Sequence, residues 1–282
     1  MGMNKPLCLT MWSRRFYRRA VNHVTSEIHG EDLARPVIVF SPHPDDETLG
    51  CGGTIIKKRK VGSDVTIVFM TDGHQSHAHL IAAHRLKSIR AREALAASGV
   101  LGVGESDVLF LGFEDGELCE NQDAAILKVV EILQHRRPDE IFIPYHREAL
   151  PDHVATHGIV VSALHTCGSN VTVYEYPIWF WHQWPWVSVP LALRRETFAT
   201  LKDSIVAGFG LRLLWDFRYS VYIGDVLELK RTALTQYKSQ MIRLIPDPRW
   251  MTLDDVWGGE FLPCFFQDHE IFHRMASLKN MY

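Results

Sequence analysis

A short apolar run that leads directly into an acidic loop constrains this chain more than any other feature. Val37-Ile38-Val39-Phe40 has the composition of a buried strand, and Ser41-Pro42-His43-Pro44-Asp45-Asp46-Glu47 follows it without a break. In open α/β sheets, ligands bind beyond the carboxyl ends of the strands. An imidazole and three carboxylates suit a borderline or hard metal ion. A solvated turn that caps the next helix is the alternative, but neighbouring carboxylates repel one another unless a cation is present.

Strand-like and helix-like segments alternate along the chain. Apolar runs predict strands at 37–40, 65–70, 108–111, 140–143 and 171–176, and helices are predicted at 85–98, 123–136, 153–164 and 230–241. This spacing is typical of parallel βαβ units. We therefore expect an α/β fold, with a Rossmann-like, mainly parallel sheet flanked by helices. Residues 1–35 are predicted to be an N-terminal extension, followed by one domain over 36–282. No element is assigned within 245–282.

The composition limits the partners and the compartment. A net charge of -3 over 282 residues argues against a dedicated nucleic-acid-binding protein. Five dispersed cysteines without a CxxC pair indicate reduced thiols and a cytoplasmic location. The sequence contains no run of 18 apolar residues, so no transmembrane helix is predicted. The basic, aromatic segment 11–20 could contact an anionic membrane surface, although a surface helix packed on the domain is the favoured interpretation.

A second polar cluster follows the predicted strand 140–143. It contains His146, and His153 and His157 follow four residues apart at the start of a predicted helix. Two polar clusters, each at the carboxyl end of a strand, predict a shared metal site at that edge of the sheet. The histidines of 74–84 have HxxHxH spacing, which can bind metal but more often lies on a surface loop.

The aromatic-rich segment 178–186 leaves two interpretations open. Its tryptophans, among them Trp181, suit stacking on sugar rings, and they equally suit a hydrophobic plug over the sheet. Because the segment and the histidines of 74–84 both follow strand ends, we predict that they frame the mouth of a substrate site.

The motifs resemble those of the PIG-L/LmbE-like zinc-dependent N-deacetylases, which include N-acetylglucosaminylphosphatidylinositol de-N-acetylase. Pro42-His43-Pro44-Asp45-Asp46-Glu47 is similar to the family signature, and Pro151-Asp152-His153 is similar to its second metal motif. The resemblance covers residues 36–275 and implies an LmbE-like fold. Further similar segments are Thr71-Asp72-Gly73, Arg90-Ala91-Arg92-Glu93, Asp115-Gly116, Tyr174-Glu175-Tyr176-Pro177, Lys230-Arg231-Thr232-Ala233-Leu234 and Tyr237-Lys238-Ser239-Gln240.

The resemblance implies a hydrolase that removes acetate from an N-acetylated amino sugar, such as an N-acetylglucosamine-type glycoconjugate. It implies that His43, Asp46 and His153 bind Zn2+, and that Asp45 is the general base acting on a zinc-bound water. Three protein ligands leave an open position for chemistry at such an ion.

The resemblance also implies the residues that meet the sugar. Arg90 and Asp115 would contact its hydroxyl groups. Trp181 is the aromatic candidate for substrate binding because it lies in the aromatic-rich segment 178–186, and not because of the resemblance.

The chain departs from the family pattern at one position. The second motif of the family usually reads His-Pro-Asp-His, and Leu150 replaces its first histidine here. That histidine is linked to oxyanion stabilisation or to protonation of the leaving amine, so His146 or His157 is expected to compensate. The alternative is a catalytically silent family member that acts as a metal-holding, sugar-binding protein.

Overall fold

The computed structural model describes residues 8–188, 201–202, 204–205 and 208–276. Within them, one eight-stranded sheet has the order β1-β7-β8-β6-β5-β2-β3-β4. The strands are β1 (Ser26–Glu27), β2 (Val37–Ser41), β3 (Val65–Thr71), β4 (Val108–Phe113), β5 (Glu140–Pro144), β6 (Thr172–Tyr176), β7 (Tyr219–Tyr222) and β8 (His269–Arg274). All neighbouring pairs are parallel except β8 with β6 and with β7. The predicted α/β fold with a mainly parallel sheet is confirmed.

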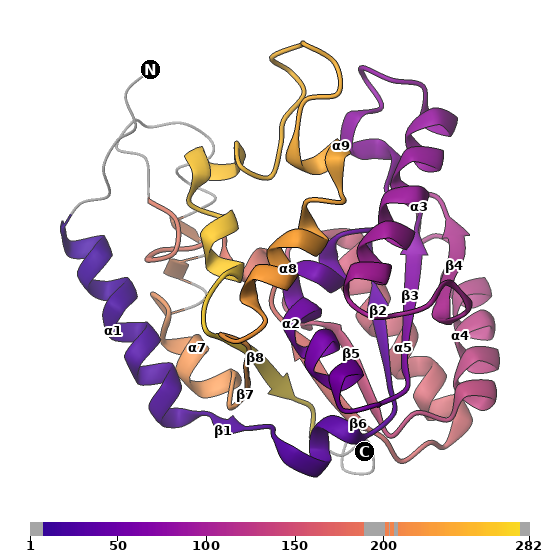
Figure 1. Ribbon diagram of the computed structural model, residues 1–282, viewed down its shortest axis with the longest axis horizontal. Coiled ribbons are helices and arrows are strands. Elements are labelled where there is room, and N and C mark those ends of the chain that lie inside the picture. The colour runs from indigo at the N-terminus through magenta and orange to yellow at the C-terminus, as the bar shows by residue number, and fades with distance from the viewer. Residues whose placement is uncertain (1–7, 189–200, 203, 206–207, 277–282) are drawn as a thin grey trace.

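The central strands β2, β3 and β5 are buried along their whole length. A strand that is covered on both faces needs apolar side chains in both directions, which explains the continuous apolar runs in the sequence. Val37 lies opposite Val65 of β3 and Glu140 of β5, so the three strands are in register and their carboxyl ends meet at one edge. The carboxyl ends of these strands point toward the top of Figure 1.

Helices cover both faces of the sheet (Figure 1). The helices are α1 (Cys8–Val24), α2 (Asp46–Lys60), α3 (Ala83–Val100), α4 (Gln122–Arg136), α5 (Pro151–Cys167), α7 (Leu211–Asp216), α8 (Leu227–Leu234) and α9 (Lys238–Met241). Helices α2, α3 and α8 share one hydrophobic core with the sheet, and α4 and α5 share a second core on the other face. No helix of the described part is both long and apolar enough to cross a membrane.

The structure corrects the sequence prediction in the C-terminal third. The five predicted strands are present, but β1, β7 and β8 were not predicted, because they are short and carry no long apolar run. The single helix predicted over 230–241 was wrong. Helix α8 ends at Leu234, and α9 begins at Lys238 after a turn that buries Tyr237 completely.

The N-terminal segment packs against the domain. Tyr17 and Val21 of α1 belong to the same core as α2, and β1 extends the sheet beside β7. The opposite side of α1 exposes Met11, Trp12 and Phe16, with the Trp12 and Phe16 rings stacked 6.0 Å apart. The domain boundary at residue 36 stays a prediction.

A buried ion pair ties α2 to the amino end of β5. Lys58 Nζ lies 2.6 Å from Glu140 Oε2, and both side chains are 1% exposed. The same ammonium donates hydrogen bonds to the carbonyl oxygens of Asp32 and Arg35, so three segments meet at one charge.

Candidate functional site

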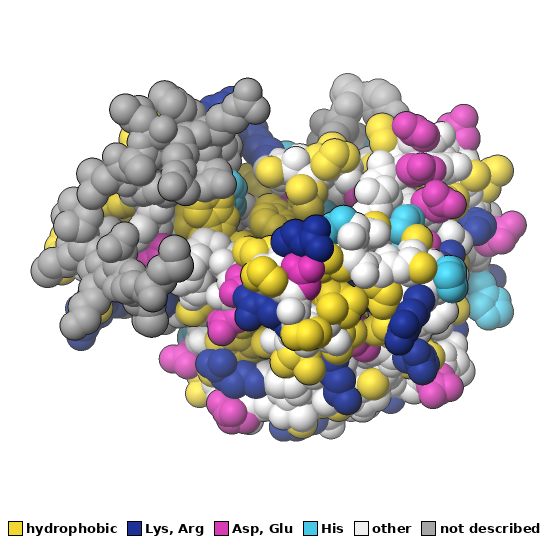
Figure 2. Space-filling view, turned by 90° about the horizontal axis from the view of Figure 1, so that it is seen from above, with side chains coloured by type: hydrophobic (Ala, Val, Ile, Leu, Met, Phe, Trp, Pro, Cys, Tyr) yellow, Lys and Arg dark blue, Asp and Glu magenta, His cyan; other side chains and the backbone are white. Residues whose placement is uncertain are grey.

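The acidic loop lies at the carboxyl edge of the sheet, between β2 and α2. Asp45 has a φ of 128°, a sparsely populated conformation for a residue with a Cβ, which costs about 1–3 kcal/mol. The surrounding contacts must stabilise this conformation, and it turns the chain sharply into the first residue of α2. Figure 2 views the molecule from this edge and shows most of the visible histidine side chains on its right half, whereas acidic side chains are spread over both halves.

Three side chains converge at this edge: His43, Asp46 and His153, which we call the metal trio. Asp46 Oδ2 lies 3.2 Å from His43 Nδ1 and 3.3 Å from His153 Nε2. Because zinc–ligand bonds are about 2.0–2.2 Å long, the donor atoms of a tetrahedral site lie roughly 3.3 Å apart. His153 is fully buried, and neither of its ring nitrogens has a hydrogen-bond partner in the described structure. These residues therefore fit a bound metal ion.

Carboxylates surround the outer sides of both imidazoles. His43 Nε2 lies 3.2 Å from Asp115 Oδ1 and 3.3 Å from Asp152 Oδ2, and His153 Nδ1 lies 3.7 Å from a Glu148 carboxylate oxygen. Carboxylates in this position orient metal-binding histidines and raise their basicity. Burial lowers the pKa of His43, but the hydrogen bonds to Asp115, Asp152 and Asp46 outweigh it and leave that pKa well above its usual value.

Asp45 lies beside the trio and contacts Arg90. The guanidinium of Arg90 donates to Asp45 Oδ2 at 3.2 Å and also to the carbonyl oxygen of Pro44. Burial raises the pKa of Asp45 to about 8; Arg90 opposes the rise, and the charges of Asp46 and Glu47 add to it. A cation held by Asp46 would oppose the rise as well, because it favours the ionised carboxylate.

Glu47 stabilises the positive-φ backbone conformation of Asp45 in the loop. Its Oε2 accepts a hydrogen bond from the Asp45 backbone N–H at 3.1 Å, and its Oε1 accepts bonds from Thr48 Oγ1 at 2.5 Å and Tyr237 Oη at 2.7 Å. All of these side chains except that of Asp45 are no more than 2% exposed. Tyr237 therefore links α8 and α9 to the acidic loop.

Tyr237→Phe should lower the free energy of unfolding by roughly 1–2 kcal/mol, because it removes one hydrogen bond to a buried carboxylate. The ring keeps its packing, so the loss reports the hydroxyl alone. Urea unfolding of the variant and of the original protein measures the difference. Equal midpoints would show that Glu47 does not depend on Tyr237.

Arg90 and Asp115 lie at the site, and both form hydrogen bonds with other groups of the protein. Arg90 is 3% exposed and also donates to the carbonyl oxygen of Gly73. Asp115 accepts from His43 and from the backbone N–H of Gln75 at 2.8 Å. Their contact with a sugar hydroxyl stays a prediction.

His146 and His157 lie in a second group, around Glu175. His146 Nδ1 is 2.7 Å from Glu175 Oε2, and His157 Nε2 is 3.0 Å from Glu175 Oε1. Leu150 is the residue before α5, and its carbonyl oxygen accepts the backbone N–H of His153 at 3.1 Å. No role was predicted for Glu175 from the sequence, although Tyr174-Glu175-Tyr176-Pro177 is one of the segments similar to the family.

The histidines of 74–84 do not form a metal group among the described residues. His74 Nδ1 contacts Asp72 at 2.7 Å, whereas His77 is buried and its ring stacks on Trp250 with 4.1 Å between centroids. The interpretation of this spacing as ordinary loop histidines therefore accounts for them.

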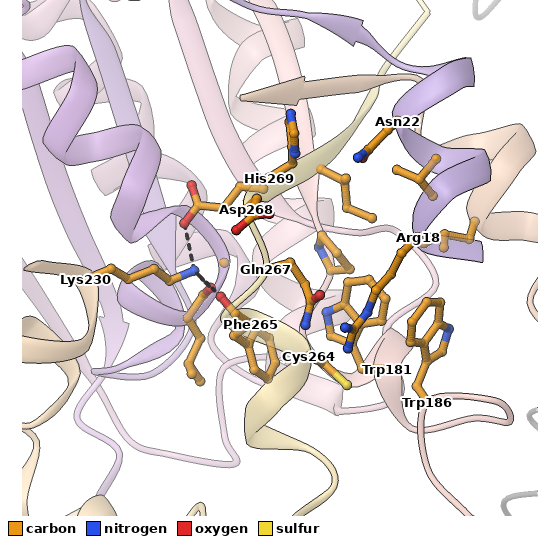
Figure 3. A pocket seen from close by; sticks show the side chains of 17 residues that line it. Arg18, Asn22, Trp181, Trp186, Lys230, Cys264, Phe265, Gln267, Asp268 and His269 are labelled. Atoms are coloured by element: carbon orange, nitrogen blue, oxygen red, sulfur yellow. Dashed lines mark hydrogen bonds and ion pairs between the residues drawn. The ribbon is translucent and has the colours of Figure 1, made fainter. Parts of the chain in front are cut away.

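Trp181 is 6% exposed and packs against Trp186, with ring centroids 4.9 Å apart. Both rings line a cavity of about 180 Å³ that α1, α2 and β8 enclose, and no member of the metal trio lines it (Figure 3). This placement favours the hydrophobic-plug interpretation of the segment 178–186. A role of Trp181 in substrate binding stays a prediction.

Comparison with known families agrees with this geometry. Residues 38–164 match the family described as PIG-L, GlcNAc-PI de-N-acetylase, and this segment includes the whole metal trio and Asp45. The match spans less than half of the chain. The resemblance seen in the motifs is confirmed.

Curated relatives are similar over most of the chain. Diacetylchitobiose deacetylase from Thermococcus kodakarensis is 26% identical over 220 residues, which cover 77% of this chain and 72% of that protein. A probable N-acetyl-alpha-D-glucosaminyl L-malate deacetylase 2 from Bacillus cereus is 28% identical over 243 residues, covering 80% of this chain and 98% of the relative.

Solved structures share the fold. The N,N'-diacetylchitobiose deacetylase from Pyrococcus horikoshii has a TM-score of 0.62 at 21% identity, with 97% of this chain and 95% of that chain covered. The 4-carboxy-2-hydroxymuconate hydratase GalB from Pseudomonas putida has a TM-score of 0.59 at 14% identity, with 86% and 96% covered. Because a hydratase shares the fold, the fold alone does not decide the reaction.

Proposed function

We propose that this protein is a zinc-dependent N-deacetylase, a hydrolase that releases acetate from an N-acetylated amino sugar and leaves a free amine. One observation carries the proposal: the metal trio, in which Asp46 and His153 are buried, with the Asp45 carboxylate beside it, a combination suited to metal-assisted amide hydrolysis. The names of the curated relatives support an N-acetylglucosamine-type glycoconjugate as the substrate class.

His43 Nδ1, Asp46 Oδ2 and His153 Nε2 would hold the ion, because these atoms converge and the outer nitrogens face carboxylates. When bound, Zn2+ supplies a Lewis acid that polarises the acetyl carbonyl and lowers the pKa of water to about 7.

Asp45 would accept the proton of the attacking water. Its carboxylate is held beside the trio by Arg90, so its reacting oxygen is oriented before the substrate arrives. The ionised form is the active one, and a cation on the neighbouring Asp46 favours that form.

The amine must gain a proton to leave, and Leu150 cannot supply one. His146 and His157 remain the candidates for this role, since each has a ring nitrogen that is hydrogen-bonded to the buried Glu175 carboxylate. Of the two, His157 lies on α5 one turn after His153, on the same helix that supplies a metal ligand.

His157→Ala should lower kcat about 10²-fold, because it removes the group that protonates the amine, while the metal content of the trio stays unchanged. Adding Leu150→His to that variant should recover activity, since it restores an imidazole at the position the family uses. Steady-state acetate release measures both, and Leu150→Phe is the control for changed packing. An unchanged kcat in His157→Ala would exclude His157 from proton transfer.

The proposed function is tested by acetate release from a panel of N-acetylhexosamine compounds, including lipid-linked ones, with the zinc content measured in parallel. We expect turnover on at least one of these substrates and loss of turnover after chelation. Zinc-loaded protein that is inactive on the whole panel would support the alternative, a silent metal-holding, sugar-binding protein. The trio and Asp45 are intact, so no observation favours that alternative.

The protein is proposed to act in the cytoplasm, in keeping with free thiols at Cys51, Cys119, Cys167 and Cys264. Peripheral contact with an anionic membrane through 11–20 is supported by the exposed Trp12 and Phe16 on α1.

A further inference from the structure

A second group of metal-ligand side chains lies outside the proposed zinc centre. It consists of His146, Glu175 and His273, whose donor atoms all lie within 4.8 Å of one another. Glu175 Oε2 is 2.7 Å from His146 Nδ1 and 3.1 Å from His273 Nδ1. These separations are close to the roughly 3.3 Å expected between the ligands of a tetrahedral ion, so only small shifts would admit one.

The sheet positions two of these three side chains directly, and the third lies in a turn next to it. Glu175 and His273 are directly paired residues of the antiparallel strands β6 and β8, and His146 follows the end of the neighbouring strand β5. The backbone N–H of His146 also donates to Glu175 Oε2 at 3.2 Å. Ligands on strands are held more accurately than ligands on loops, so Glu175 and His273 are preorganised, and the backbone bond to Glu175 fixes the turn that carries His146.

The exposure of the group suits the entry of an ion. The Glu175 side chain is 1% exposed and forms the floor, whereas His146 is 33% exposed and His273 is 26% exposed. An ion can therefore enter from solvent past two imidazoles and reach a carboxylate that is shielded from water.

The remaining oxygen of Glu175 has a partner of its own. His157 Nε2 lies 3.0 Å from Glu175 Oε1, which leaves Oε2 to face His146 and His273. Burial raises the pKa of Glu175, but hydrogen bonds from His146, His157 and His273 outweigh it and hold that pKa well below its usual value. A metal ligand must be ionised, and contacts with three imidazoles favour the ionised form of this carboxylate.

We propose that His146, Glu175 and His273 form a second metal site, which takes a divalent first-row transition ion such as Zn2+. Two imidazoles and one carboxylate are a common ligand set for such ions, and His157 orients the carboxylate from the other side. The proposal is independent of the deacetylase function. It also gives different roles to the two histidines that were candidates for protonating the amine. His146 is a ligand of the second ion, and His157 stays available for proton transfer.

The test counts metal ions in the full chain. Protein is dialysed against micromolar ZnCl2 and then against metal-free buffer, and zinc per chain is measured by elemental analysis. We expect about two ions in the original protein, about one in Asp46→Ala, about one in His273→Ala, and near zero when both substitutions are combined. His135→Ala, which removes an exposed histidine of α4, is the matched control and should leave the count unchanged.

A spectroscopic readout separates the two sites. Co2+ added to Asp46→Ala should give the visible absorption of a four-coordinate ion, and Glu175→Gln in that background should abolish it. Thermal unfolding without metal checks that each variant is folded. One zinc per chain in the original protein, together with none in Asp46→Ala, would overturn the second site. So would an unchanged count in folded His273→Ala. Neither result bears on acetate release, so the metal count tests the second site separately from the deacetylase function.

Discussion

Asp45→Asn should retain its zinc and lose about 10²–10⁴-fold in kcat, which is what a positioned general base contributes. The amide has the shape of the carboxylate and can still accept the hydrogen bond from Arg90, but it cannot take a proton from water. Asp45 is not a member of the metal trio, so the ion should stay bound. Acetate release gives kcat, and elemental analysis of the same sample gives the zinc content.

The matched variant is Asp46→Asn, one residue along the chain. Asp46 Oδ2 faces both His43 and His153, so this change should reduce zinc binding as well as turnover. Added zinc at high concentration should recover part of the activity of Asp46→Asn and none of that of Asp45→Asn. If both variants lose zinc equally, Asp45 is a ligand or a structural residue and the division of roles is wrong.

Lys58→Met should lower the free energy of unfolding by about 3–5 kcal/mol, because it leaves the Glu140 carboxylate buried without its partner. Glu140 is 0% exposed, and the other cation near it, Arg35, is 3.6 Å away and 41% exposed. The carbonyl oxygens of Asp32 and Arg35 would lose a donor at the same time. Urea unfolding with a constant m-value measures the loss.

Lys57→Met is the control, since it is the same substitution one residue earlier on α2. Lys57 pairs with Asp225 at 3.1 Å, and the Asp225 side chain is 50% exposed, so its loss should cost only about 0–1 kcal/mol. Adding Glu140→Leu to Lys58→Met should recover much of the stability, because it removes the unpaired charge. A cost below that of Lys57→Met would show that water reaches Glu140.

Local patterns predicted the elements that hold the metal trio. Val37-Ile38-Val39-Phe40 is buried on both faces of a parallel sheet, so its composition alone identified β2. Because parallel strands share one carboxyl edge, the residues after β2 and after β5 were expected to meet, and the rings of His43 and His153 lie 5.3 Å apart. The prediction was weakest where elements are short: β8 has six residues with one apolar pair, Ile271-Phe272, in a segment without an assigned element.

The sequence by itself determined the parallel core, the position of the acidic loop and the residue types at the metal trio. These follow from local information: hydrophobic runs that must be buried, and a spacing that sets which strand end each polar residue follows. Only the tertiary structure decided which ionisable side chains contact one another. Glu175 meets His273 because β8 runs antiparallel beside β6, and Lys58 meets Glu140 across 82 residues of chain. Such pairings depend on strand order and on the exclusion of water between packed elements, and no short stretch of sequence encodes either.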